Sequence, residues 1–433
     1  MSVESATYIS QLNSALPANT DLITEGASQI KLVKGTLLAT FPNFTATPVT
    51  PTTADLNTIA GASSTGATAL NVATQAATNN STLAASTAMV QAALLASTGV
   101  TAVLPAQSGN SGKFLTTDGS TASWGDFQLF NRIINGGMAI DRRNEGAAQT
   151  FTAAAALAYC VDRWYGYCTG ANVTGQRVAG SVKSQYRYQF TGAASVTAIG
   201  FGQRIEAANS YDMNTETATF GVDLANSLLT SVTWTAYYAN TADTFGTLAT
   251  PTRTQIATGT FTVTSTVTRY TASITIPAAA ITGIEIVLTV GAQTSGTWTI
   301  GSVSLERGAA SGDFVPRPKT VEQSLCERFL PVTEAAYLAA QAYGTTSGYV
   351  SAQFRVPAYR APTGITPSAA AAGYSLTNTA FAATVCASLT FGAGAVGGGS
   401  FAAVVGSGVL TAGNATTFIA DAGNKIIWTG CEL

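Results

Sequence analysis

The residues best able to do chemistry in this sequence are a few carboxylates, because the chain contains no histidine. Without histidine, the commonest general base and the commonest metal ligand are missing, and so is every Ser-His or Cys-His nucleophile. Glycoside hydrolysis remains open, since it needs two carboxylates at a set separation. The acidic residues available for it in the central region are Asp141, Glu145, Asp162, Glu206 and Glu306.

None of these carboxylates stands out as a tuned acid. Asp162 precedes Arg163 and Trp164, and we interpret it as half of a buried or edge ion pair. Glu206 follows Arg204 in a strand-like run, which favours the same interpretation. Because structural ion pairs also perturb such groups, we expect no catalytic residue and no enzyme. A polysaccharide-degrading activity is the least favoured alternative.

The cysteines do not suggest a metal or redox centre. They are Cys160, Cys168, Cys326, Cys386 and Cys431, without CxxC spacing. An odd, scattered set argues against a zinc site and against a disulfide framework. Cys160 and Cys168 flank a turn-sized segment and could pair, but buried free thiols are the favoured interpretation. We therefore predict neither a metal nor a cofactor.

The low charge of the chain favours an assembled protein. Charged residues make up 10% of it, against roughly 25% in ordinary globular proteins, and a neutral surface promotes association. The net charge is −2 and the one adjacent basic pair, Arg142-Arg143, lies between Asp141 and Glu145, so we expect no nucleic-acid binding. We also expect no signal peptide and no transmembrane helix.

Residues 1–44 predict short helices that need a partner. Two apolar stripes recur at helical spacing: Tyr8, Leu12 and Leu16, and then Ile30, Val33, Leu37 and Phe41. Thr24 is the expected cap of the second helix, and Pro42 ends it. Because so short a segment cannot bury either stripe, both need a partner surface, either another copy of the chain or a neighbouring protein. We expect the segment to dock on a neighbouring protein through the second stripe.

The next segments predict a narrow shaft and a joint. Residues 45–103 are rich in Ala, Ser and Thr, and Leu83, Thr87, Val90 and Leu94 form a short coiled-coil-like seam. A helix packed on its own domain and a helix repeated about a symmetry axis both fit this seam. In residues 104–129, Asp118-Gly119 predicts a tight turn that pairs Lys113–Thr117 with Ser120–Trp124.

From residue 130 onward the apolar pattern has the period of a β-strand. The clearest runs are SQYRYQF, TATFGVDLA, VTWTAYY, FTVTSTV, GIEIVLTV and TWTIG. Such strands without intervening helices predict an antiparallel, jelly-roll-like sandwich over residues 130–317. VPRPKTVEQSLCERFLP then predicts a hinge with a short helix, and GYVSAQFRVP and KIIWTGCEL predict strands of a small β domain over residues 318–433.

The C-terminal region carries the aromatic residues that we expect to bind a receptor. Aromatic rings with a polar edge, set among Asn, Gln and Thr, suit a glycan. The candidates are Tyr343, Tyr349, Tyr359, Tyr374, Phe391 and Phe401. Packing of these rings within a trimer is the competing interpretation. The Gly-rich stretch Phe391–Gly408 indicates either close backbone approach or exposed loops with open hydrogen-bonding groups.

Several segments, in this order, resemble the tail fibre and receptor-binding proteins of tailed bacteriophages. They are NNSTLAASTAMVQAAL, LPAQSGNSGKFLTTDGSTASW, NRIINGGMAIDRRNEG, YCVDRWYGY and GSVSLERGAASGDFVPRPKTVEQSLCERF, with the final Glu-Leu. The sequence departs from the family at GGMAID, where a Phe-x-Ile-Trp-Gln run is common.

The resemblance implies a homotrimeric fibre in the virion, made in the host cytoplasm. Its N-terminus (1–44) would attach to a tail, baseplate or adaptor protein, followed by the shaft (45–103), the linker (104–129) and the sandwich (130–317). The C-terminal tip (318–433) would meet a host polysaccharide or an outer-membrane receptor. The alternatives are a structural connector that carries another receptor-binding protein and, less favoured, a tailspike that degrades polysaccharide.

Overall fold

The computed structural model describes residues 5–7, 11–16, 18, 20, 22–41, 108, 114–117, 121–125, 131–154, 156–181, 184–308, 313–334 and 337–433. The chain divides into two compact units, residues 1–107 with 117–123 and residues 108–116 with 124–433. Tyr8, the Leu83–Leu94 seam and the Asp118-Gly119 turn lie outside the described residues. Among the described residues, no helix has the length and apolarity needed to span a membrane.

The first unit contains one of the two expected N-terminal helices. A 3₁₀ turn, η2 (Ile23–Glu25), leads into α1 (Gly26–Thr40), whose C-cap is Phe41, as the following Pro42 predicts. The expected cap was wrong, because Thr24 lies inside η2 and the N-cap of α1 is Glu25, without a side-chain hydrogen bond. The first stripe was also wrong where it is described, since Leu12 and Leu16 lie outside any helix.

The predicted pairing of two strands in the linker is confirmed. Strands β1 (Phe114–Thr117) and β2 (Ala122–Gly125) form a two-stranded sheet. Both strands begin within two residues of the predicted ones, because the short apolar run and the turn residues leave little choice of pairing.

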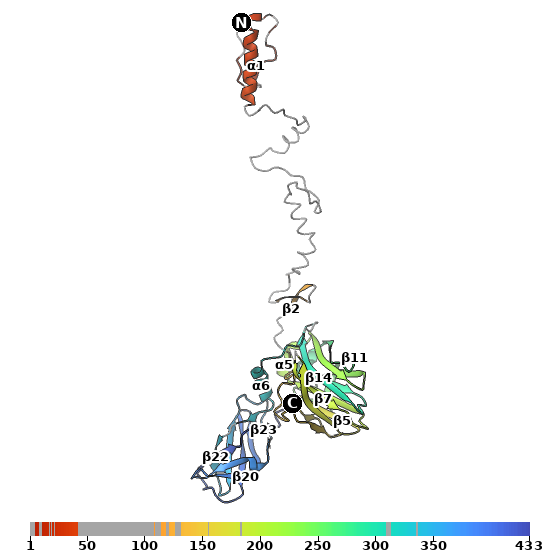
Figure 1. Ribbon diagram of the computed structural model, residues 1–433, viewed down its shortest axis with the longest axis vertical. Helices are drawn as coiled ribbons and strands as arrows, with labels where there is room; N and C mark the ends of the chain where they lie inside the picture. The colour runs from red at the N-terminus through yellow and green to blue at the C-terminus, as the bar shows by residue number, and fades with distance from the viewer. Residues whose placement is uncertain are drawn as a thin grey trace. The chain divides into compact units, whose positions relative to one another are not determined.

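The second unit contains the predicted antiparallel sandwich, made of two six-stranded sheets (Figure 1). The β13 sheet has the order β11 (Arg253–Thr262), β10 (Ser231–Ala239), β13 (Ile284–Val290), β8 (Ala198–Ile205), β5 (Tyr165–Thr169) and β4 (Ala158–Tyr159). The β14 sheet has the order β12 (Thr268–Thr275), β9 (Thr217–Asn226), β14 (Thr297–Arg307), β7 (Ser184–Thr191), β6 (Val173–Ser181) and β3 (Gln149–Phe151). Three short helices lie between strands: α5 (Ala207–Ser210), η3 (Tyr211–Met213) and η4 (Ala278–Thr282).

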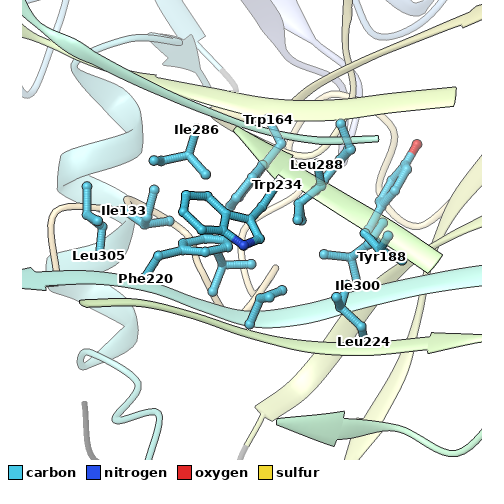
Figure 2. Close-up of a cluster of buried hydrophobic side chains, with 14 of the residues drawn as sticks. Ile133, Trp164, Tyr188, Phe220, Leu224, Trp234, Ile286, Leu288, Ile300 and Leu305 are labelled. Atoms are coloured by element: carbon cyan, nitrogen blue, oxygen red, sulfur yellow. The ribbon is translucent and has the colours of Figure 1, made fainter. Parts of the chain in front are cut away.

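The alternating apolar residues of the strands meet between the two sheets, as their period of two requires. Figure 2 shows Trp234 of the β13 sheet beside Phe220 of the β14 sheet, with Ile286 and Ile133 close by. Trp164 stacks on Phe201 with 4.7 Å between ring centroids. All five cysteines are buried and free, so the interpretation as buried thiols is confirmed.

The DRW motif connects the sandwich to the helix that follows it. Asp162 forms the expected buried ion pair, but with Arg142, at 2.7 Å. The Arg163 guanidinium lies 3.5 Å from the ring centroid of Phe329, just beyond α6 (Lys319–Glu327). The short helix predicted for this region is confirmed, and the motif contributes to its attachment.

The rest of the chain forms a closed six-stranded barrel and a small three-stranded sheet. The barrel order is β16 (Tyr337–Ala342), β17 (Ser347–Gln353), β21 (Gly398–Val405), β20 (Ala383–Ala395), β19 (Tyr374–Thr377) and β22 (Ala415–Ala420). The small sheet has the order β15 (Val332–Thr333), β23 (Ile426–Thr429) and β18 (Gly364–Pro367), and η5 (Ala371–Gly373) precedes β19. The mainly β fold class, with a sandwich and a small C-terminal β domain, is confirmed.

Close backbone approach explains the glycine-rich stretch. A Cβ atom on Gly399 would lie 2.4 Å from the Trp428 ring, and one on Gly394 would lie 2.3 Å from the Pro362 carbonyl oxygen. These residues belong to the paired strands β20 and β21. The expectation that this backbone lies open to a ligand was therefore wrong for the strand residues.

Candidate functional site

The six aromatic candidates of the C-terminal region do not form one site. Tyr374 and Phe401 are fully buried in the core of the barrel, where both pack on Phe418 with centroid distances of 5.6 and 5.0 Å. Their rings are not available to a ligand, and this correction follows from their inward positions on β19 and β21. The half-buried Phe391 is 6.4 Å from the ring of Trp428.

Tyr359 also packs against another side chain of the protein. Its ring stacks on Phe329 with 5.2 Å between centroids. Burial raises the pKa of Tyr359, and the neighbouring Asp243 carboxylate raises it further. Tyr343 and Tyr349 remain on the surface, with 57% and 43% of their area exposed, and only these two keep a ring free for binding.

A different set of tyrosines lies on the outer side of the β13 sheet. Because side chains alternate along a strand, Tyr165 and Tyr167 of β5 point away from the sandwich core. They pair with Gly202 and Gly200 of β8. A Cβ atom on Gly200 would lie 2.1 Å from Cζ of Tyr167, and one on Gly202 would lie 2.5 Å from Oη of Tyr165. The two rings therefore lie across the sheet over bare glycine backbone.

A charged cluster continues this surface on the neighbouring strands. Glu285 of β13 pairs across the sheet with Arg204 of β8 on one side and Tyr237 of β10 on the other. Nε of Arg204 and the hydroxyl of Tyr165 each donate to Oε1 of Glu285 at 2.7 Å. Nη1 of Arg253 donates to the other carboxylate oxygen. Glu285 is completely buried under these groups.

Arg253 connects the charged cluster to the rings. Its guanidinium lies 4.2 Å from the ring centroid of Tyr237, within the range of a cation–π contact. Burial raises the pKa of both Tyr165 and Tyr167, and the Arg253 charge lowers it in both.

Hydroxyl and amide groups complete the surface. Thr235 and Thr258 exchange a hydrogen bond of 3.0 Å between their hydroxyls, and Gln255 pairs opposite Tyr237. We call this surface the tyrosine face, and it consists of Tyr167, Thr233, Thr235, Tyr237, Arg253, Gln255, Thr258 and Thr289. An aromatic surface ringed by hydroxyl, amide and guanidinium donors can stack on the apolar side of a sugar and bond its hydroxyls.

The carboxylates considered for hydrolysis are held by structural partners. Oδ2 of Asp141 accepts a bond from the amide of Gly146 at 2.7 Å, and burial raises its pKa. Glu145 pairs with Lys425, and Glu206, one residue beyond β8, pairs with Arg328 at 2.7 Å.

Glu306 is the one of the five for which no ion pair is recorded among the described residues. Burial raises the pKa of its carboxyl, against the charges of Arg269 and Arg317. In the described parts of the chain, no three His, Cys, Asp or Glu side chains gather as metal ligands would.

The tyrosine face was not identified in the sequence analysis, although one part of it can be seen in the sequence. The alternation Tyr165-Gly-Tyr167 occurs inside the YCVDRWYGY segment, and it marks two rings on one side of a strand. The rest of the face cannot be predicted without the order and register of the strands. Arg253, Glu285 and Tyr237 come from three different strands that are neighbours only in the sheet.

No protein-family model matches the sequence, and neither does any curated protein. Among solved structures, the family 11 carbohydrate-binding module of Clostridium thermocellum with a β-1,3-1,4-mixed-linked tetrasaccharide is 12% identical. Its TM-score is 0.24, and the match covers 36% of this chain and 98% of that one. TmCBM61 with β-1,4-galactotriose is 12% identical, with a TM-score of 0.24 and coverage of 34% and 88%.

The enzymatically active domain of bacteriophage CBA120 tailspike protein 4 also matches in part. It is 16% identical with a TM-score of 0.26, and the match covers 41% of this chain but 21% of that one. At these identities and TM-scores, the matches carry no inference about residues, ligands or activity.

Proposed function

We propose that this protein is a tail fibre of a tailed bacteriophage and that it binds a host surface glycan through the tyrosine face. The observation that carries the proposal is the ring of Tyr167 lying over Gly200 on the same side of the sheet as an arginine, Arg253, that is held by Glu285 and Tyr237. The phage assignment is supported by the ordered sequence segments, several of which form the sandwich and its exit helix.

The energetics of the face suit weak, repeated binding. An aromatic contact contributes about 0.5–1.5 kcal/mol beyond the area that it buries, so one flat face gives modest affinity. Homotrimerisation, which the low charge of the chain favours, would place three such faces on one particle and raise the effective concentration. We propose this trimer as part of the function.

The remaining parts of the proposal follow the chain. Residues 1–44 attach the fibre to a tail, baseplate or adaptor protein, which the exposed stripe on α1 supports. The protein resides in the virion, binds no nucleic acid and degrades no polysaccharide. The structural partners of Asp141, Glu145, Asp162 and Glu206 support binding over hydrolysis.

The barrel is the competing location for the receptor site. Tyr343 and Tyr349 are its exposed candidates, but the hydroxyl of Tyr349 is engaged with Ser400 and the Ala361–Ala420 tract supplies no charged side chain. The tyrosine face offers more types of contact within a smaller area, and we therefore favour it.

Two tyrosine variants distinguish these locations. In full-length protein, Tyr167→Ala should weaken adsorption to host cells by about tenfold or more, which corresponds to about 1.4 kcal/mol per site. Tyr349→Ala removes an exposed ring from the barrel and should leave adsorption within about twofold. Loss of adsorption in Tyr349→Ala alone would move the site to the barrel, and loss in neither would reject the proposed contact.

A further inference from the structure

The two arginines that share Glu285 differ in how fully their donors are used. Two guanidinium groups, those of Arg204 and Arg253, share the single carboxylate of Glu285. The outward positions of the five longer strands of the β13 sheet contain no other acidic residue, as their register shows. Arg204 also donates from Nη1 and Nη2 to the main-chain oxygens of Leu433 and Gly246, at 3.1 and 3.0 Å, whereas Arg253 makes no such further bond to a described residue.

Arg253 is the one of the two arginines with donor groups that no described residue uses. Its side chain is 14% exposed, whereas that of Arg204 is 9% exposed and that of Glu285 is fully buried. Nη1 of Arg253 is used by Glu285, but its Nε and Nη2 donate to no described residue and are not sealed from solvent. Two donors on one edge of a guanidinium match the two oxygens of a carboxylate.

The neighbours of Arg253 fix its orientation before any ligand arrives. The carboxylate of Glu285 holds one end, and the Tyr237 ring supports the plane of the guanidinium. An arginine side chain that is already held in place loses little conformational entropy when a ligand binds. More of the interaction energy therefore contributes to the affinity. A freely moving surface arginine would not give this advantage.

We propose, building on the function inferred above, that the tyrosine face selects acidic glycans, with the carboxylate of a uronic-acid-type sugar bound to Arg253 and its ring placed against Tyr167. The hydroxyls of Thr235 and Thr289 lie on the same face and bond the hydroxyls of the sugar. A neutral glycan would leave Nε and Nη2 of Arg253 without a negatively charged partner, and it binds less tightly.

The test uses full-length protein and paired polymers. Polygalacturonate, alginate and hyaluronate are each compared with the same polymer after reduction of its carboxylates to alcohols. Calorimetry should show at least one acidic polymer binding about tenfold or more tighter than its reduced form. Added salt should weaken binding to that acidic form and not to the reduced one.

Arg253→Gln should abolish this difference. Arg307→Gln is the matched control, because it also removes one guanidinium but from an exposed pair with Glu216 on the β14 sheet. Thermal unfolding checks that both variants fold. Arg253→Lys, which keeps the charge and loses the planar fork, should keep the salt dependence and lose most of the preference.

Equal binding to acidic and reduced polymers, binding to none of the acidic polymers, or a preference that survives Arg253→Gln would each overturn the inference. Tighter binding to a poly(glycerol phosphate) than to every uronate polymer would overturn the carboxylate assignment. Cell adsorption that depends on Tyr167 in any of these cases would leave the proposed function standing, whereas adsorption unaffected by Tyr167→Ala rejects that function itself.

Discussion

At the scale of single residues, Glu285 is the buried carboxylate that holds Arg253 in the tyrosine face. It is fully buried on the outer side of a sheet, where two arginines and the hydroxyl of Tyr165 surround it. Without it, Arg204 and Arg253 would both lose the carboxylate that they share. The position of Arg253, and with it the positive charge offered to a ligand, depends on this one carboxylate.

Glu285→Gln should therefore destabilise the sandwich. Removing one partner of a buried ion pair costs about 3–5 kcal/mol, because the other charge stays buried without compensation. Glu216→Gln breaks an exposed pair with Arg307, and such pairs contribute about 0–1 kcal/mol. Urea unfolding of both variants measures the difference, and equal, small losses would contradict the central place of Glu285.

Glu306 should give the protein a dependence on pH of the opposite sign to that of an ordinary ion pair. Burial raises the pKa of its carboxyl in the folded protein. The folded state then binds more protons than the unfolded state, so the free energy of unfolding falls as the pH rises from the unfolded pKa of about 4.3 through the folded pKa.

Glu306→Gln should remove this contribution, because glutamine has no proton to lose. The variant should show a smaller fall in the free energy of unfolding between about pH 5 and about pH 8. Carboxyls with a raised pKa titrate in about this range. Denaturant titrations at both values of pH provide the measurement. The same pH dependence in variant and wild type would show that Glu306 does not titrate in this way.

At the scale of elements, strand β5 contributes side chains to both faces of the β13 sheet. Gly166 and Cys168 face the core, while Tyr165 and Tyr167 lie over the glycines of β8. Gly200 and Gly202 are what allow the two rings to lie flat, because any side chain there would lift them from the sheet. The shape of the tyrosine face is thus set by residues that have no side chain.

Gly200→Ala should test this arrangement. Its Cβ atom would overlap the ring of Tyr167, which must swing away, so we expect weaker glycan binding with a loss of stability of about 1 kcal/mol. Gly291→Ala is the matched control, because nothing lies within 4 Å of its added Cβ atom. Full binding by Gly200→Ala would show that the flat position of Tyr167 is not needed.

The sandwich was predictable because its strands carry their signal locally. Phe220, Val222 and Leu224 alternate along β9, and all three are completely buried in the structure. The exit helix was predictable for the same reason, from its flanking prolines and short apolar pattern. In contrast, the closure of the barrel and the burial of Tyr374 and Phe401 depend on which strands pair, and no local pattern contains that.

The same limit explains the candidate site. An exposed tyrosine and a buried one look alike in a sequence when both occur in alternating strands, as Tyr349 and Tyr374 do. Arg253 and Glu285 are 32 residues apart and come together only through the order of β11, β10 and β13. The sequence shows that both residues are charged, but it does not show that they form an ion pair.

At the scale of the whole molecule, the exposed apolar stripe of α1 and the half-buried rings of the tyrosine face belong to different compact units. The stripe of Ile30, Val33, Leu37 and Phe41 on α1 is 43–58% exposed in the described structure. We propose this stripe as the contact with a tail protein, because an exposed apolar surface is typical of protein–protein contacts. Attachment and recognition are then expected to be altered separately by mutation.

Replacing Ile30 and Leu37 with Asp should release the fibre from virions while the β domains stay folded. Two charges on the apolar stripe oppose its burial against a tail protein. Ile30 and Leu37 are not part of the sandwich core, so the β domains should keep their fold. Ser28→Asp, at an exposed position of the same helix, is the control and should leave incorporation unchanged. Immunodetection of purified particles gives the result, and normal incorporation of the double variant would reject this stripe as the anchor.

The central claim is that a host glycan lies on the tyrosine face, and a structure of the full-length protein with an oligosaccharide released from the host surface tests it most directly. The account predicts a sugar ring against Tyr167, with hydroxyl contacts to Thr235 or Thr289 and an acidic group on Arg253. A sugar bound instead to the barrel beside Tyr343 or Tyr349, with the tyrosine face empty, would contradict it.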